Sequence, residues 1–270
     1  MKKIIVIKIG GSLIKNAVML EPLIMALKIL INQGMKFIIV HGGGPQADEL
    51  NQKLDIPIKK VNGRRITDSQ TLLTVKMIYK GLLNTDLVAL CEKYEISAVG
   101  ISGVDGKIAE VVKRPLMNGV NFGFVGDIKK INDDLINIIL EKNYLPIIAC
   151  LAIDSSGQVF NINADTLATK IALKLNVDKL IFITDVKGVL ESKNNKYIKQ
   201  LSIDEAEKMI KKGIITNGMI PKIENIKKAI ISDINKILIV GGLKDKTKWI
   251  NAIKNDDYGT IIIPNYKFIK

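Results

Sequence analysis

Histidine and arginine are the scarce residues of this 270-residue chain. His41 is the single histidine, which excludes a metal cage built from histidines and argues against a catalytic triad that depends on one. Only three of the 40 basic residues are arginines, namely Arg64, Arg65 and Arg114. Any bidentate clamp on a carboxylate must therefore come from one of these three guanidinium groups.

Cysteine and long apolar runs are also scarce. Cys91 and Cys150 lie far apart in apolar surroundings, so we expect reduced thiols in the core rather than a disulfide. No uninterrupted apolar run reaches the roughly 18 residues of a membrane-spanning helix. The apolar stretch after the N-terminal lysines ends too early for a signal peptide. We therefore expect a cytoplasmic protein without a membrane partner.

The net charge of +13 would suit a protein that binds nucleic acid, but the pattern of charge does not. The lysines are spread over the whole chain beside abundant isoleucine and asparagine, a bias typical of an AT-rich coding sequence. Basic residues do not alternate with aromatic ones, which form only 5% of the chain. We expect no nucleic-acid partner and a small, acidic, phosphate-bearing ligand instead.

Short apolar runs alternate with segments of helical periodicity. The runs are rich in isoleucine and valine and are continuous, as in strands buried on both faces of a parallel sheet. This pattern predicts an α/β fold, a three-layer αβα sandwich with a central, mainly parallel sheet. The expected strands are Ile4–Ile9, Phe37–Val40, Ser97–Ile101, Leu145–Cys150, Leu180–Thr184, Ile237–Val240 and Thr260–Ile263. The expected helices are Glu21–Asn32, Ala47–Leu54, Ser69–Tyr94, Asp133–Lys142, Ala164–Leu175, Ser202–Lys212 and Lys222–Ser232. Ser202, with Glu205 three residues later, predicts a capping box at the start of its helix.

Two stretches depart from this alternation. Residues 107–128 contain three glycines and few helical signals, which predicts a β-hairpin or lid. Residues 187–200 are polar and predict a surface loop. Because no Pro/Ser-rich linker is present, we expect one domain over 1–270, with an N-lobe of about 1–175 and a C-lobe of about 176–270 that share one sheet.

Two glycine-rich turns follow the first two expected strands, Lys8-Ile9-Gly10-Gly11 and His41-Gly42-Gly43-Gly44. Glycines let the backbone approach an anion closely and leave N–H groups directed at it. Such loops lie at the carboxyl edge of an open α/β sheet, where ligands bind. Lys8 precedes its glycines, unlike the lysine of a Walker A motif. An ordinary strand-to-helix turn is the alternative, and we expect His41 to pack or to bond to its own loop rather than to act as a base.

Two further segments offer polar groups. Asn62-Gly63-Arg64-Arg65-Ile66-Thr67 places a guanidinium fork beside a turn, which suits a substrate carboxylate. Asn161 and Asn163 alternate in a segment expected to be extended, so both amides should share one side, and Asp165 starts the following helix. A carboxylate there would orient lysines through ion pairs rather than act as a base. A solvated basic turn and a helix-start aspartate without function are the alternatives.

Two later loops complete the set. Thr184-Asp185-Val186-Lys187-Gly188-Val189 offers groups for the sugar or adenine of a nucleotide, and Gly213–Lys222 ends on a second candidate cation, Lys222. Either loop alone could be an ordinary surface turn. Together, the cations, the glycine amides and the acid suit phosphoryl transfer, which needs positioning and positive charge more than covalent help.

In this order, and over essentially the whole chain, these motifs resemble the amino-acid kinase family. Val99–Gly106 and Gly218–Lys222 add to the resemblance. It implies the amino-acid kinase fold and transfer of the γ-phosphoryl group of ATP to the γ-carboxylate of N-acetyl-L-glutamate, for arginine synthesis. It also implies Mg²⁺ that bridges the ATP phosphates with few or no direct protein ligands. No general base is required, because the attacking carboxylate is already ionised near neutral pH.

The resemblance also implies a role for each motif. The catalytic residues would be Lys8, Lys222, Asp165, Gly11 and Gly44. The lysines would neutralise charge on the transferred group, the glycine amides would donate to it, and the aspartate would orient the lysines. The acceptor would be held by Gly43, Gly44, Arg65 and Asn161. The nucleotide would be held by Lys8, Gly10, Gly11, Thr184, Asp185, Gly188, Met219 and Lys222.

Two alternatives stay open. Met77–Asn84, followed by Gly103–Gly106, is also similar to aminoadipate kinases of lysine synthesis, which act on a longer substrate attached to an acidic carrier protein. A catalytically silent, ligand-binding homologue is the alternative outside the enzymes. The chain starts directly at its first strand, whereas arginine-inhibited members carry an extra N-terminal helix. The resemblance therefore implies a homodimer that arginine does not inhibit.

Overall fold

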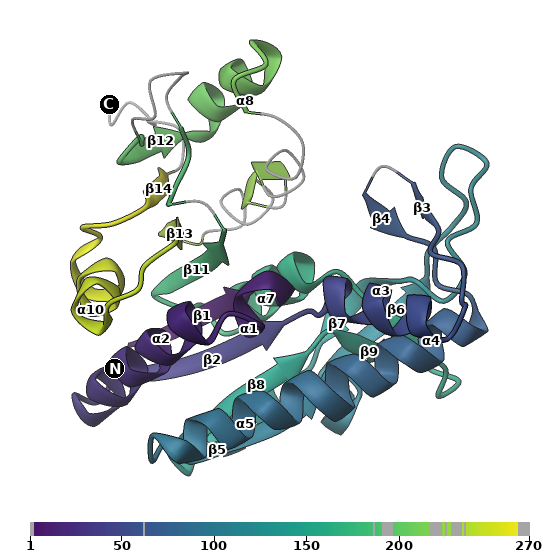
Figure 1. Ribbon diagram of the computed structural model, residues 1–270, viewed down its shortest axis with the longest axis horizontal. Coiled ribbons are helices and arrows are strands. Elements are labelled where there is room, and N and C mark those ends of the chain that lie inside the picture. The colour runs from purple at the N-terminus through teal and green to yellow at the C-terminus, as the bar shows by residue number, and fades with distance from the viewer. Residues whose placement is uncertain are drawn as a thin grey trace.

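An eight-stranded sheet forms the centre of the molecule (Figure 1). The computed structural model describes residues 3–61, 63–185, 187–190, 197–215, 223–224, 226–227, 234 and 236–263. The strands of the sheet are β1 (Ile4–Ile9), β2 (Lys36–His41), β5 (Ala98–Ser102), β8 (Leu145–Ala149), β11 (Lys179–Thr184), β12 (Gln200–Ser202), β13 (Ile237–Gly241) and β14 (Thr260–Ile263). Their order is β12-β14-β13-β11-β1-β2-β8-β5, and only the β13–β14 pairing is antiparallel. The predicted strands and the mainly parallel sheet are confirmed.

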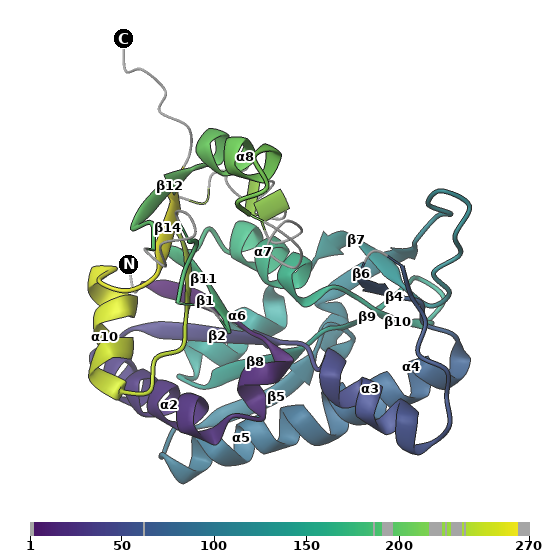
Figure 2. The same ribbon diagram turned by 45° about the horizontal axis from the view of Figure 1, so that its top comes forward.

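Helices cover both faces of this sheet, which gives the predicted three layers. One face carries α2 (Ala17–Asn32), α5 (Asn84–Lys93) and α10 (Lys246–Asn255), and the other carries α6 (Asp134–Glu141), α7 (Ala164–Lys174) and α8 (Ile203–Lys211). Figure 2 shows α2 and α5 on one side of β1 and β2, and α7 on the other. Ser202 begins α8 with the predicted capping box to Glu205.

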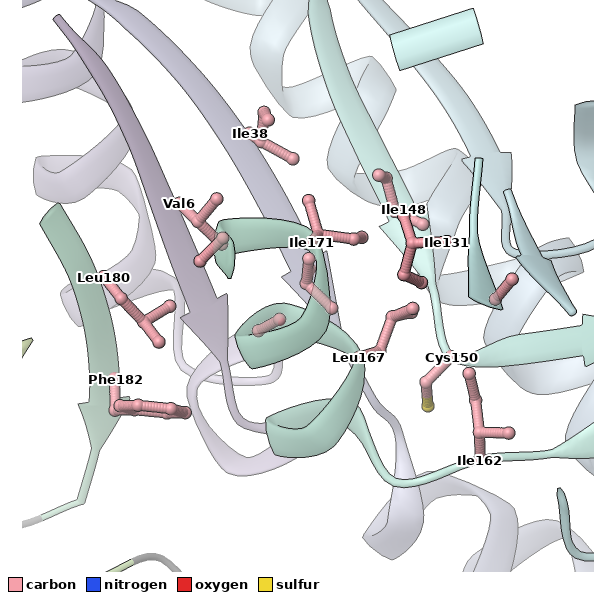
Figure 3. Close-up of a cluster of buried hydrophobic side chains, with 14 of the residues drawn as sticks. Val6, Ile38, Ile131, Ile148, Cys150, Ile162, Leu167, Ile171, Leu180 and Phe182 are labelled. Carbon is pink, nitrogen blue, oxygen red and sulfur yellow. The ribbon is translucent and has the colours of Figure 1, made fainter. Parts of the chain in front are cut away.

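The side chains of β1 explain why its sequence is apolar throughout. Ile5 and Ile7 pack in the cluster beneath α2, whereas Val6 packs in the cluster beneath α7. Figure 3 shows the second cluster, in which Leu167 and Ile171 of α7 lie over the sheet. A strand with two buried faces loses the apolar–polar alternation of a half-exposed strand.

Smaller sheets extend from the carboxyl end of the central strands. β6 (Ala109–Lys113) and β7 (Gly126–Ile131) form the predicted hairpin and join β9 (Leu151–Ile153) and β10 (Val159–Asn161) in a four-stranded sheet. A short hairpin of β3 (Lys60–Val61) and β4 (Arg64–Arg65) projects from the same end (Figure 1). An isolated bridge between Thr67 and Gly123 ties the two projections together.

The helix predicted over Ser69–Tyr94 has an unexpected middle. α4 (Ser69–Lys76) continues into a π-helical segment, η1 (Met77–Leu83), before α5 begins. Tyr79 and Leu83 of η1 approach Gly43 so closely that a Cβ there would lie 2.4 Å from Leu83 Cδ1. Only glycine fits at that contact, and π-helical segments often occur at functional sites.

The remaining expectations have mixed outcomes. Cys91 and Cys150 are buried free thiols, as predicted. The helix expected over Lys222–Ser232 falls largely outside the described residues. Within the described ranges, no helix is both long and apolar enough to cross a membrane. The central sheet contains strands from both sides of residue 175, and the division into two lobes stays a prediction.

Candidate active site

A cavity of about 770 Å³ opens where β1 and β2 end and the smaller sheets begin. Positively and negatively charged side chains line this cavity, together with Gly42, Gly43 and Gly44 of the second glycine turn. The sequence-predicted residues that line it are Lys8, Gly10, Gly11, Gly43, Gly44, Arg65, Asn161 and Asp165. Residues separated by more than 150 positions in the sequence thus surround one space, as expected for the carboxyl edge of a parallel sheet.

Lys8 and Asp165 form the charged centre of this cavity. Lys8 leaves the end of β1, Asp165 lies in the first turn of α7, and Lys8 Nζ lies 2.8 Å from Asp165 Oδ1. Among the described residues, Asp165 is the sole ion-pair partner of Lys8, and Lys8 donates no hydrogen bond to another residue. N–H groups of its ammonium are therefore available to a ligand.

The two glycine turns are in direct contact. A Cβ on Gly11 would lie 3.3 Å from Gly43 Cα and 3.0 Å from Pro45 Cδ, so a larger residue would separate the turns. Gly11 opens the short helix α1 (Gly11–Ile14), and Gly44 opens α3 (Gly44–Lys53). Both turns therefore direct helix-start backbone at the same region.

The side chain of His41 is hydrogen-bonded to the second glycine turn. Its side chain is fully buried, with Nδ1 3.0 Å from the carbonyl oxygen of Gly42 and Nε2 3.0 Å from Asn84 Nδ2. Nδ1–H thus donates to its own loop, and Nε2 accepts from Asn84. Burial lowers the pKa of His41 to about 4, so the imidazole is neutral near pH 7. The expected loop-bonding role of His41 is confirmed.

Arg65 and Arg64 differ although they are neighbours in β4. Arg65 is buried and donates to Asp48 Oδ1 at 2.6 Å and to the carbonyl oxygen of Gly44 at 3.0 Å. Arg64 is exposed and contacts Met117. Burial disfavours the charge on Asp48, but hydrogen bonds from Arg65 and Lys60 outweigh it and lower the pKa of this carboxyl. Arg65 is therefore a fixed, charged fork beside the second glycine turn.

Asn161 and Asn163 both line the cavity, and so does Ile162 between them, so the lining does not show the expected alternation of sides. Asn161 ends β10, and its Nδ2 donates to Thr67 Oγ1 at 3.1 Å. Asn163 is the N-cap of α7, because its Oδ1 accepts from the backbone N–H of Thr166 at 2.9 Å. The capping role of Asn163 was not predicted, although an asparagine two residues before an acidic first turn is a signal for it.

Three of the residues expected to hold the nucleotide, Thr184, Asp185 and Gly188, lie at or after the end of β11, beside β1. Thr184 ends that strand, and Asp185 Oδ1 accepts from Ser12 Oγ at 2.6 Å. A Cβ on Gly188 would lie 2.7 Å from Thr260 Oγ1, so the loop packs against β14. These three residues are not part of the cavity lining. Met219 and Lys222 lie outside the described residues.

Sequence reasoning missed several residues of the cavity wall. Tyr79, Arg114 and Cys150 line it, and Arg114 donates to Asp127 Oδ1 at 2.6 Å. Burial raises the pKa of Cys150 to about 12, so this thiol is not a nucleophile. Arg114 was detectable as one of only three guanidinium groups, whereas nothing in the sequence distinguished Tyr79 or Cys150.

Known proteins share this architecture. Residues 3–241 match the sequence model of the Amino acid kinase family. Acetylglutamate kinases from Brachyspira hyodysenteriae and Bacillus licheniformis are each 37% identical, over 96% and 97% of this chain and 90% and 97% of their own sequences. The crystal structure of smu.665 from Streptococcus mutans superposes with a TM-score of 0.80 at 32% identity, covering 97% of this chain and 99% of that one. The chain belongs to the amino acid kinase family.

Proposed function

We propose that this chain transfers the γ-phosphoryl group of ATP to the side-chain carboxylate of N-acetyl-L-glutamate, giving N-acetyl-L-glutamyl 5-phosphate for arginine biosynthesis. The observation that carries the proposal is the meeting of the Lys8–Asp165 pair, two touching glycine turns and Arg65 around one cavity. The acetylglutamate kinases described above support the choice of acceptor.

The phosphoryl group is transferred between Lys8 and the two glycine turns. Lys8 neutralises charge that develops on the moving group, while the amides of Gly11 and Gly44 donate to its oxygens. Asp165 holds the Lys8 ammonium in place and leaves N–H groups of Lys8 to donate to the phosphoryl group. Preorganised donors of this kind stabilise the transition state, because they need no reorganisation as charge shifts. Lys222 is the second cation of this proposal.

Arg65 and Asn161 hold the acceptor. Two N–H groups of Arg65 are used by Asp48 and Gly44, which leaves the rest of its five donors for the α-carboxylate of the substrate. Asn161 and the backbone of Gly43 take the acetamide end. The acceptor then lies beside the second glycine turn, with its side-chain carboxylate directed toward Lys8.

The nucleotide is held from the C-lobe side, by the loop after β11. Thr184, Asp185, Gly188 and Met219 contact the base and sugar, and the bond from Ser12 fixes Asp185 beside the first glycine turn. Within the described ranges, no cluster of three or more His, Cys, Asp or Glu side chains could form a metal cage. Mg²⁺ that accompanies ATP would supply positive charge that offsets the charge of the phosphates.

The active form is a homodimer. Leu73 and Met77, one helical turn apart on α4 and η1, are about half exposed, as is Leu82. An apolar stripe on the N-lobe helix is suited to a second copy of the chain. Sedimentation velocity should give the mass of a dimer, and a monomer at all concentrations would contradict this part of the proposal.

Coupled ADP release with a panel of acceptors tests the proposed reaction. We expect turnover with N-acetyl-L-glutamate and much less with free glutamate, N-acetyl-2-aminoadipate, carrier-bound 2-aminoadipate or UMP. Preferred turnover of either aminoadipate compound would assign the chain to the longer substrate, although one methylene is worth only about 1–3 kcal/mol. Absence of turnover with every acceptor would refute the kinase assignment in favour of a silent ligand-binding homologue.

A further inference from the structure

Gln46, directly after the second glycine turn, is hydrogen-bonded to the first. It lies in the first turn of α3, directly after Pro45, and its side chain is only 4% exposed. Its Nε2 donates to the carbonyl oxygen of Gly11 at 2.7 Å. A Cβ on Gly11 would lie 2.7 Å from Gln46 Oε1, so the amide packs flat against the Cα of this glycine. The side chain of Gln46 thereby fixes the position of the Gly11 carbonyl in the first glycine turn.

The other half of the Gln46 amide is not satisfied. Gln46 Oε1 is buried and has no hydrogen-bond partner among the residues that the structure describes. A buried polar atom without a partner costs about 1–3 kcal/mol. Turning the amide over would place oxygen against the oxygen of Gly11, so the observed orientation is the one that the Gly11 bond requires. A side chain selected for stability alone at this position would be apolar.

We propose that Gln46 is a positioning residue for phosphoryl transfer, which holds the first glycine turn at a fixed distance from the second. This inference rests on the proposed function. Gly11 and Gly44 donate to oxygens of the same phosphoryl group. They follow β1 and β2, which pair as far as Ile9 and His41, and beyond that pairing the Gln46 bond joins the turns themselves, while a Lys15–Glu49 ion pair joins the helices that follow them. Displacement of one donor by a fraction of an ångström weakens its bond in the transition state.

Two near-isosteric substitutions separate positioning from packing. Gln46→Met keeps the volume but removes both the Gly11 bond and the unsatisfied oxygen, and Gln46→Glu replaces the donor by a carboxylate oxygen. We expect kcat of Gln46→Met to fall about tenfold, with both Michaelis constants within about threefold of those of the unaltered protein. Its melting temperature should be unchanged or higher, because the unsatisfied oxygen is gone. Gln46→Glu should lose at least as much kcat.

Gln52 provides the matched control, since it lies on the same helix with an exposed side chain. Gln52→Met and Gln52→Glu should leave kcat unchanged. The proposal is overturned if Gln46→Met keeps kcat within twofold of the unaltered protein. It is also overturned if kcat falls only in step with a lowered melting temperature, because that result is what a purely structural role predicts.

Hydrogen exchange gives a second readout that needs no acceptor. The amides of Leu13 and Ile14 are bonded to the carbonyl oxygen of Gly10, within the turn that Gln46 holds. Peptides covering residues 9–15 should exchange about tenfold faster in Gln46→Met and unchanged in Gln52→Met; equal exchange in both would overturn the clamp. If the unaltered protein phosphorylates none of the acceptors, the proposed function fails, and this exchange experiment still decides whether Gln46 joins the turns.

Discussion

Two lysine–aspartate pairs lie at opposite ends of the central sheet. They differ in the number of further partners that their charged groups have. At the carboxyl end, Lys8 is paired with Asp165, and the side chains are 13% and 16% exposed. At the amino end, Lys179 is paired with Asp256, and the side chains are 8% and 10% exposed. Burial is therefore similar in the two pairs and does not identify the one that carries chemistry.

The difference lies in the neighbours of each pair. Lys179 donates to Asp256 and also to the carbonyl oxygen of Ile253, each at 2.6 Å, and the second oxygen of Asp256 is taken by Lys236. Lys8 instead borders a large cavity, and Asp165 is its sole ion-pair partner among the described residues. An ion pair whose groups are bonded to several neighbours, which we call saturated, holds elements of the fold together. An ion pair beside a cavity whose lysine has no other partner retains N–H donors for a ligand.

The largest effect should come from Lys8→Arg. A planar guanidinium cannot replace a compact ammonium beside the moving phosphoryl group, so kcat should fall about a hundred- to a thousandfold. The Michaelis constant for ATP should change far less. The matched substitution at the other end, Lys179→Arg, should leave kcat nearly unaltered. Steady-state kinetics of both variants check the contrast, and equal losses of turnover and of ATP affinity in Lys8→Arg would count against the assignment.

The free energy of unfolding, unlike turnover, should depend strongly on the Lys179–Asp256 pair. Burial lowers the pKa of Lys179, and the hydrogen bond to the carboxylate of Asp256 opposes that shift. Lys179→Met leaves Asp256 with Lys236 as its remaining cation and should cost about 3–4 kcal/mol in the free energy of unfolding. Turnover of the folded variant should be kept. Urea unfolding measures the cost, and a loss below about 1 kcal/mol would show that the saturated pair is not structural.

His41, at the carboxyl end of the sheet, should make the stability of the folded protein sensitive to acid. Its pKa is lowered by burial to about 4 in the folded protein and is near 6.5 when unfolded, so only the unfolded chain binds this proton between those values. Stability therefore falls with pH from about 6.5 to about 4, by about 3 kcal/mol in total. His41→Gln lacks this dependence. Unfolding curves of both proteins across this range should converge toward acid pH; parallel curves would contradict a neutral, buried imidazole.

A smaller effect should distinguish the two neighbouring arginines. Arg65→Ala should raise the Michaelis constant for N-acetyl-L-glutamate about ten- to a hundredfold, because a charge-assisted bond to a carboxylate is lost. The constant for ATP should stay nearly the same. Arg64→Ala, which alters an exposed side chain, is the control and should change neither constant by more than about threefold. An unaltered acceptor constant in Arg65→Ala would remove Arg65 from the binding pocket.

The sequence predicted those features that depend on nearby residues. The seven expected strands, the capping box at Ser202 and the two glycine turns are all local patterns, and each was found, whereas the three-residue strand β12 was not predicted. Parallel strands then bring the turns to one edge, so the meeting of Lys8 with Asp165 also followed from the pattern. The placement of the predicted site was therefore largely accessible without coordinates.

The partners that hold the site in place were not accessible in this way. Gln46, Asn84 and Asp48 bond to Gly11, His41 and Arg65, which come from other elements of the chain. Such contacts depend on exact distances between packed elements, and no local period encodes them. The π-helical segment η1 was missed for a related reason, since its one wider turn barely alters the apolar spacing of a long helix.

A crystal structure with a non-hydrolysable ATP analogue and N-acetyl-L-glutamate would test the central claim most directly. We predict that the terminal phosphorus lies between the Lys8 ammonium and the amides of Gly11 and Gly44, with an acceptor oxygen in line behind it. Asp165 should remain paired with Lys8 in that complex. Terminal phosphate oxygens beyond hydrogen-bonding reach of Lys8 and of both glycine turns would contradict the account.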